Sequence, residues 1–235
     1  MSKYKYTPKT KKELIELIED ESIYLGDIDT KYITDMSYLF AGCTRKDFSG
    51  IETWNTSNVE NMSHMFANCE FFNQDISGWD VGNVVVMVSM FYNCTAFNQP
   101  LGDWDVGNVE DMARMFAGCE NFNQDISKWN VSKVESMASM FSGCKSFNQD
   151  LRSWDVSNVV DMKGMFHKCT SFNQNISKWN TSNVEDMAYM FWGCQAFNQD
   201  ISSWNINCVE IIEDMLENCP IDNSNKPKNL KKLSV

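Results

Sequence analysis

The nine residues FNQDISKWN, residues 122–130, recur through the chain with small changes. Related stretches begin at residues 72, 97, 147, 172 and 197 and read FNQDISGWD, FNQPLGDWD, FNQDLRSWD, FNQNISKWN and FNQDISSWN. Seven tryptophans lie 25 residues apart from Trp54 to Trp204, and seven cysteines do so from Cys69 to Cys219. A period of this length lies within the range of leucine-rich-type repeats and predicts a solenoid of stacked coils.

Each coil contains two segments whose apolar spacing predicts regular structure. Trp129 and Val131 are two residues apart, which predicts a short strand with both side chains facing inward. Ser132 and Glu135 form the S-x-x-E pattern of a helix capping box. The next apolar residues share one helix face: Val134, Met137, Met140, Phe141 and Cys144. We therefore expect an α/β repeat, a leucine-rich-repeat-like solenoid with one short parallel strand and one helix in each 25-residue coil.

Stacking explains why the same residues return in every coil. One coil cannot bury both its tryptophan and its methionine and phenylalanine stripe, but stacked coils cover one another. Asn123 and Gln124 are expected to hydrogen-bond between coils as ladders. We expect one solenoid domain, with an N-terminal capping helix in residues 1–22, eight coils in residues 23–219 and a C-terminal cap in residues 220–235. The stretch NLKKL, residues 229–233, is predicted as a capping strand.

The overall charge narrows the choice of partners. The chain has 235 residues and a net charge of −12, and its pI is about 4.6. Such a chain repels nucleic-acid phosphates and anionic lipids, so we expect neither as a partner. No apolar run approaches the roughly 20 residues of a membrane span, and no signal-peptide pattern opens the chain. We expect a cytoplasmic monomer, or a surface or secreted protein if a leader was removed or a non-classical route is used.

The repeat resembles a known family. The stretch FNQDISKWNVSKVESMASMFSGC, residues 122–144, is similar to the BspA-like repeats of bacterial surface proteins, a divergent leucine-rich repeat. The resemblance covers residues 25–219. It implies a right-handed solenoid with a sheet on one side and a role in binding other proteins, often at host or cell surfaces. It implies no catalytic residues.

The cysteine row permits two interpretations. Eight of the nine cysteines occupy one repeat position, whereas Cys208 replaces the asparagine of S-N-V. A disulfide framework is one interpretation. The other is a stack of buried thiols that act as small apolar groups, which we favour because even spacing places each cysteine above the next. A chain without a leader also resides in a reducing compartment, so we expect nine free cysteines.

Metal and catalytic sites have weak support in the sequence. His167 and Cys169 are two residues apart, but a zinc site needs a second such pair. Rows of Asp and Asn, such as Asp125 with Asn175, suit either calcium binding or the stabilisation of turns, and we favour turns because Asn replaces Asp freely. Nucleotide-binding, zinc-protease and hydrolase motifs are absent from the sequence. We expect no enzyme, no cofactor and no metal.

Binding residues are expected where the coils differ. One row faces away from the core on the predicted sheet and is flanked by an Asn/Asp row; together they comprise Asp103, Lys128, Ser153, Lys178, Asp105, Asn130, Asp155 and Asn180. The alternative is an aromatic pair on the helix side, Tyr189 and Trp192. The hypotheses are a non-enzymatic scaffold that binds an unidentified protein, a bacterial surface adhesin or self-assembling structural protein, and a calcium-dependent binding module.

Overall fold

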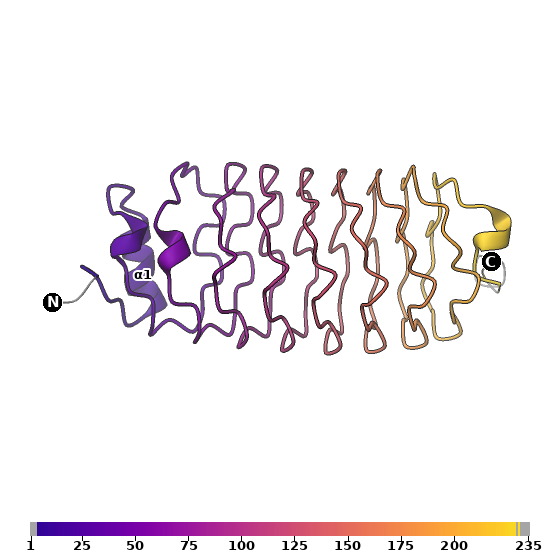
Figure 1. Ribbon diagram of the computed structural model, residues 1–235, viewed down its shortest axis with the longest axis horizontal. Coiled ribbons are helices and arrows are strands. Elements are labelled where there is room, and N and C mark those ends of the chain that lie inside the picture. Colours follow the sequence, from indigo (N-terminus) through magenta and orange to yellow (C-terminus); the bar gives the residue numbers. More distant parts are fainter. Residues whose placement is uncertain (1–3, 229, 231–235) are drawn as a thin grey trace.

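The computed structural model describes residues 4–228 and residue 230, and most of this chain forms neither helix nor strand. The helical elements in the described part are α1 (Lys11–Ile18) and the short 3-10 helices η1 (Leu25–Asp27), η2 (Ile51–Thr53) and η3 (Asn223–Asn225). The remaining chain winds as coils stacked side by side along one long axis, with α1 at the N-terminal end (Figure 1). The predicted solenoid with a 25-residue period is confirmed.

Backbone hydrogen bonds tie one segment of each coil to the next coil. Parallel bridges link the coils at Asp35, Asn61, Val86, Asp111, Ser136, Asp161, Asp186 and Ile211. Every second N–H group in this segment donates to the next coil; for example, the Arg114 and Gly118 N–H groups donate to the Ala138 and Ser142 carbonyls at 2.8 and 2.7 Å. We call this surface the ladder face; it comprises residues 60–68 and the equivalent residues of each later coil, up to 210–218.

The predicted strand and helix within each coil are both wrong. Residues 127–128 and 132–133 form turns on either side of Trp129 and Val131, and the parallel bridge lies instead at Ser136, inside the predicted helix. The segment from 134 to 144 is a series of turns, in which the N–H groups of Val134, Met140, Ser142 and Cys144 bond three residues back. Ser139 and Gly143 have left-handed φ angles of 55° and 75°, which an α-helix does not contain.

The spacing between coils explains why no helix forms. Hydrogen-bonded backbones lie about 4.8 Å apart, whereas an α-helix with its side chains is about 10 Å wide. Away from the ladder, stacked rings also keep the coils close; the Phe122 and Phe147 centroids, for example, are 6.0 Å apart. A straight stack this tight has no room for one helix per coil. Consecutive turns bury the same residues, so the apolar spacing is satisfied without a helix.

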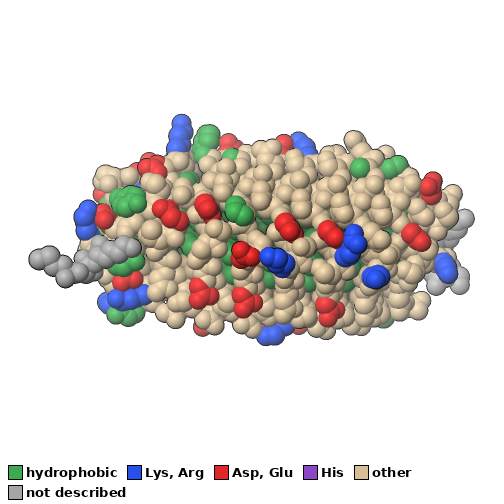
Figure 2. All heavy atoms as spheres, viewed as in Figure 1, with side chains coloured by type: hydrophobic (Ala, Val, Ile, Leu, Met, Phe, Trp, Pro, Cys, Tyr) green, Lys and Arg blue, Asp and Glu red, His purple; other side chains and the backbone are tan. Residues whose placement is uncertain are grey.

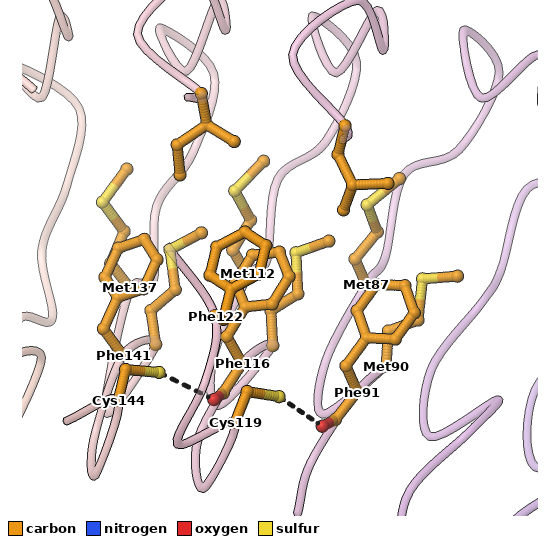
Figure 3. Close-up of a cluster of buried hydrophobic side chains, with 14 of the residues drawn as sticks. Met87, Met90, Phe91, Met112, Phe116, Cys119, Phe122, Met137, Phe141 and Cys144 are labelled. Atoms are coloured by element: carbon orange, nitrogen blue, oxygen red, sulfur yellow. Dashed lines mark hydrogen bonds between the residues drawn. The ribbon is translucent and has the colours of Figure 1, made fainter. Parts of the chain in front are cut away.

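The core is a set of parallel rows of identical side chains. Phe116 is fully buried and stacks on Phe141 of the next coil at 5.8 Å and on Phe122 of its own coil at 4.1 Å. The methionine rows pack beside these rings (Figure 3). Trp129 is 3% exposed, and its indole N–H donates to the Leu101 carbonyl of the preceding coil at 2.9 Å. The predicted inward orientation of the tryptophan row is therefore confirmed.

A ladder of side-chain amides also links successive coils. The side-chain oxygen of Asn123 accepts the backbone N–H of Asn148 and the side-chain N–H of Gln149, both at 2.9 Å. The same pattern links Asn148 to the following coil. The predicted Asn and Gln ladders are confirmed, and they show that these repeated polar residues serve the fold.

The cysteine row is a second ladder, made of thiols. All nine cysteines are free, and those from Cys69 to Cys194 are buried. The Cys119 and Cys144 thiols donate to the Phe91 and Phe116 carbonyls at 2.9 and 3.0 Å (Figure 3). Burial raises the pKa of Cys144 well above its ordinary value. The buried-thiol interpretation therefore describes the row.

The two ends of the stack are covered differently. Helix α1 buries Leu14 against the first coil, and the Thr10 hydroxyl caps it by accepting the Glu13 N–H at 3.2 Å. The Lys11 ammonium anchors the helix to Asp35 at 3.0 Å. At the other end the predicted capping strand, NLKKL, lies outside the described residues except for Leu230, which packs partly buried against the core.

Candidate interaction surfaces

The row predicted to bind a partner lies on turns, not on a sheet. Asp103, Lys128, Ser153 and Lys178 are exposed at successive coils, so the stack brings them together as expected. The Lys128 ammonium lies 3.6 Å from an Asp103 carboxylate oxygen, and the two side chains are 75% and 90% exposed. An ion pair this exposed contributes little to stability. Figure 2 shows one long face, where acidic and basic side chains lie scattered and form no large patch of one charge.

The flanking Asp and Asn residues stabilise turns. The side-chain oxygens of Asp105, Asn130, Asp155 and Asn180 each accept the backbone N–H two residues ahead, at 3.1–3.2 Å. Asp and Asn interchange here because both supply the same acceptor. Hydrogen bonds from Ser157 hold the pKa of Asp155 below its ordinary range. Residues 4–228 and 230 contain no group of three or more His, Cys, Asp or Glu placed to hold a metal ion.

The alternative pair, Tyr189 and Trp192, lies on the ladder face rather than on a helix. The Trp192 ring stacks on the His167 ring of the preceding coil, with centroids 5.0 Å apart. The Lys168 ammonium lies 5.1 Å from the centre of the same ring. Tyr189 hydrogen-bonds to Glu213 of the following coil, which raises the pKa of its hydroxyl. Trp192 is thus the member of the pair that offers an aromatic surface beside a cation.

A hollow of about 420 Å³ adjoins Trp192. Its lining residues, which define the Trp192 hollow, are Lys145, Lys168, Thr170, Trp192, Gly193, Gln195 and Asn218. The Lys145 ammonium pairs with Glu120 at 2.7 Å, and both side chains are about half exposed. Lysine stems add apolar wall while their ammonium groups stay in water. The hollow therefore combines an aromatic wall with two cations.

The last coil presents an open end of the ladder. Its groove, of about 610 Å³, is lined by residues 210–217 and Leu230. The N–H groups of Ile212, Asp214 and Leu216 donate to no backbone carbonyl in the described part of the chain, although their equivalents in earlier coils do. Ile211 is 50% exposed. Sequence reasoning missed this groove, because the open donors follow only from knowing which N–H groups form the ladder.

These features define a class of protein: a repeat solenoid whose surface is built mainly from residues that serve the fold. The chain belongs to the family described as "Mycoplasma protein of unknown function, DUF285", whose model matches residues 12–129 and 111–229. No curated protein matches the chain. The sequence was expected to resemble BspA-like repeats, and the family model that matches it is the DUF285 model instead.

One solved structure gives a distant likeness. A leucine-rich repeat protein from Bacteroides ovatus is 14% identical, covers 75% of this chain and 67% of its own length, and has a TM-score of 0.26. A likeness at that score carries no argument about this chain. In residues 4–228 and 230, no helix is long and apolar enough to cross a membrane.

Proposed function

We propose that this protein is a non-enzymatic scaffold that binds a protein partner through the Trp192 hollow. The observation that carries the proposal is a tryptophan beside a hollow, at a position of the ladder face where the residue type changes from coil to coil. The residues there are Ala67, Tyr92, Ala117, Ser142, His167, Trp192 and Glu217 in successive coils. The surface rows that form turns and side-chain ladders keep Asn, Gln or Asp in nearly every coil, whereas this row varies. A large aromatic ring at this position serves neither purpose, so a binding role accounts for it.

The chemistry of the hollow suggests what the partner presents. Tryptophan is enriched at the energetic centres of protein interfaces, where it fills or lines a pocket. Lys168 places a positive charge at the rim of a chain whose net charge is −12, and Lys145 adds a second that it shares with Glu120. Like charge elsewhere repels acidic partners, whereas this site attracts a carboxylate. The partner is a protein segment with an apolar side chain next to Asp or Glu.

The predicted row of Asp103, Lys128, Ser153 and Lys178 stays a second candidate surface. We expected partners to bind this row because a continuous strand would make it stiff, but these residues lie in turns instead. The ladder face has the continuous inter-coil hydrogen bonds that the row was expected to have. The stiffer of the two surfaces is therefore the ladder face, which carries Trp192.

The other functional hypotheses gain less support. The BspA-like resemblance favours an adhesin at a cell surface, and that role would use the same binding surfaces. End-to-end self-assembly is disfavoured because helix α1 covers the first coil and blocks pairing with the open last coil. A calcium-dependent module is disfavoured because the Asp rows already accept backbone hydrogen bonds.

A random peptide library displayed on phage tests the proposal against the full chain. We expect selected peptides to combine an aromatic or aliphatic residue with Asp or Glu. Their binding should be lost with Trp192→Ala and weakened by Lys145→Glu with Lys168→Glu. Tyr92→Ala is the matched control, because it removes an aromatic ring from the same coil position far from the hollow. Peptides that bind Trp192→Ala normally but lose binding to Lys128→Glu with Lys178→Glu would move the site to the predicted row.

A further inference from the structure

Two cysteine thiols face each other at the N-terminal end of the cysteine row. The Cys43 and Cys69 sulfurs are 3.2 Å apart, and the Cys69 thiol also lies 2.8 Å from the Phe40 carbonyl. The next cysteine, Cys94, instead bonds only to a carbonyl, that of Phe66, at 2.9 Å. No other two cysteines in residues 4–228 share a hydrogen bond. Cys43 lies 26 rather than 25 residues before its neighbour, because the segment between the two cysteines has one extra residue; Phe40 still stacks on Phe66, so Cys43 keeps its place in the row.

The surroundings of Cys43 differ from those of the buried thiols. Cys43 is half-buried and lines a surface hollow of about 270 Å³ together with Arg45. Arg45 is 7% exposed, and its guanidinium donates to the Ile18, Ile23 and Asp47 carbonyls at 3.2, 3.2 and 2.7 Å. These partners are neutral carbonyls, and Arg45 forms no ion pair in residues 4–228 and 230, although the Asp47 carboxyl is near enough to sense its charge. A fixed positive charge therefore lies beside an accessible thiol.

Electrostatics supports the same distinction. The hydrogen bond between Cys69 and Cys43 lowers the pKa of Cys43 to about 7; the Arg45 N–H and charge act in the same direction, and burial and the Glu21 carboxylate oppose them. Burial raises the pKa of Cys119 well above the ordinary value. Cys43 thus ionises at neutral pH, while the thiols from Cys94 to Cys194 stay protonated and unreactive.

We propose that Cys43 and Cys69 form a redox pair that a peroxide converts into an inter-coil disulfide. The Cys43 thiolate attacks one peroxide oxygen, the O–O bond breaks, and Cys43 becomes a sulfenic acid while hydroxide takes up a proton to form water. The Cys69 sulfur then attacks the Cys43 sulfur, the S–O bond breaks, and the departing oxygen leaves as water with the Cys69 proton. Two thiols lose two electrons, and one peroxide yields two waters.

The bond would lock the end of the solenoid. Solenoid coils are held only by their neighbours, so the ends open first. The Phe40 and Gly42 N–H groups bond to the Met65 and Ala67 carbonyls at 2.9 and 2.7 Å, directly beside the pair. Oxidation should slow hydrogen exchange at these two amides and leave exchange in the middle coils unchanged.

Peroxide titration of the reduced full chain, followed by alkylation and non-reducing peptide mapping, tests the proposal. We expect a Cys43–Cys69 disulfide, while Cys94 to Cys194 remain thiols. Cys43 in the native chain should react several-fold faster than in urea, because unfolding removes the neighbours that favour the thiolate. Cys69→Ser should leave a sulfenic acid at Cys43 that dimedone traps, and Cys43→Ser should protect Cys69.

Cys94→Ser is the matched control, since it removes an interior member of the row and should leave the disulfide unchanged. Oxidation of exposed Cys208 ahead of Cys43 would overturn the proposal. So would a Cys43 that reacts no faster in the native chain than in urea. These outcomes are independent of partner binding at the Trp192 hollow, which lies several coils away along the stack.

Discussion

Replacing Trp129 by alanine tests whether the tryptophan row holds the stack together. Trp129 is 3% exposed and lies between Phe116 and Trp154, with ring centroids 6.2 and 6.4 Å away. Truncating a large buried aromatic side chain costs about 3–5 kcal/mol. The loss also leaves the Leu101 carbonyl without its indole donor, which by itself costs about 1–3 kcal/mol when no water replaces it. We expect the free energy of unfolding to fall by about 4 kcal/mol, the middle of the range for truncating a buried aromatic side chain, because water can enter the space left and bond to the Leu101 carbonyl.

Equilibrium unfolding in urea, followed by circular dichroism, measures this change. Trp129→Phe keeps a ring in the row but removes the donor, so it should cost about 1–3 kcal/mol and fall between wild type and Trp129→Ala. Lys128→Ala, at the exposed neighbour, should stay within about 0.5 kcal/mol of wild type. A nearly neutral Trp129→Ala would refute the reasoning, because it would mean that the tryptophan row faces solvent.

Three further predictions follow from the ladders, the cap and the turns. Asn148→Ala removes an acceptor that joins two coils, and because it is exposed we expect a loss of about 1 kcal/mol by thermal melting, with faster hydrogen exchange at Asn173. Deleting residues 1–22 uncovers the first coil, so light scattering should show aggregation or a calorimetric scan a lower Tm; an unchanged monomer would contradict this. Hydrogen bonds from the Ser127 hydroxyl and N–H hold the pKa of Asp125 below its ordinary value. Its contribution to stability is therefore present above the unfolded pKa of about 3.9 and is lost as pH falls through the lower folded value. Asp125→Asn keeps the turn, so it should make acid unfolding shallower, and an unchanged acid profile would contradict the assignment.

Much of the interior could be predicted because one repeat fixes one set of contacts. The 25-residue period places identical residues in register, so the inward Trp129, the stacked thiols and the Asn123 ladder follow from spacing alone. The helix could not be predicted correctly in this way. Apolar residues at intervals of three and four suit a helix, but tandem turns bury the same set, and only the spacing between coils decides between them.

The candidate site could likewise be predicted only in part from the sequence. Trp192 stands out in the sequence as one of two aromatic residues at predicted surface positions, and this is how it was found. The hollow beside it needs Lys145 and Thr170 from two earlier coils, and each of these follows a left-handed residue, Gly143 and Lys168, by two positions. Cys43 offered one signal, the extra residue before Cys69, but its meaning required the 3.2 Å contact.

The most direct test of the account is an NMR measurement of scalar couplings across backbone hydrogen bonds in the isotopically labelled chain. The account predicts couplings between the Arg114 amide nitrogen and the Ala138 carbonyl carbon, and between Gly118 and Ser142, as each coil bonds to the next. Couplings from each amide to the carbonyl four residues back, within residues 134–144, would instead show a helix in every coil and contradict the structure.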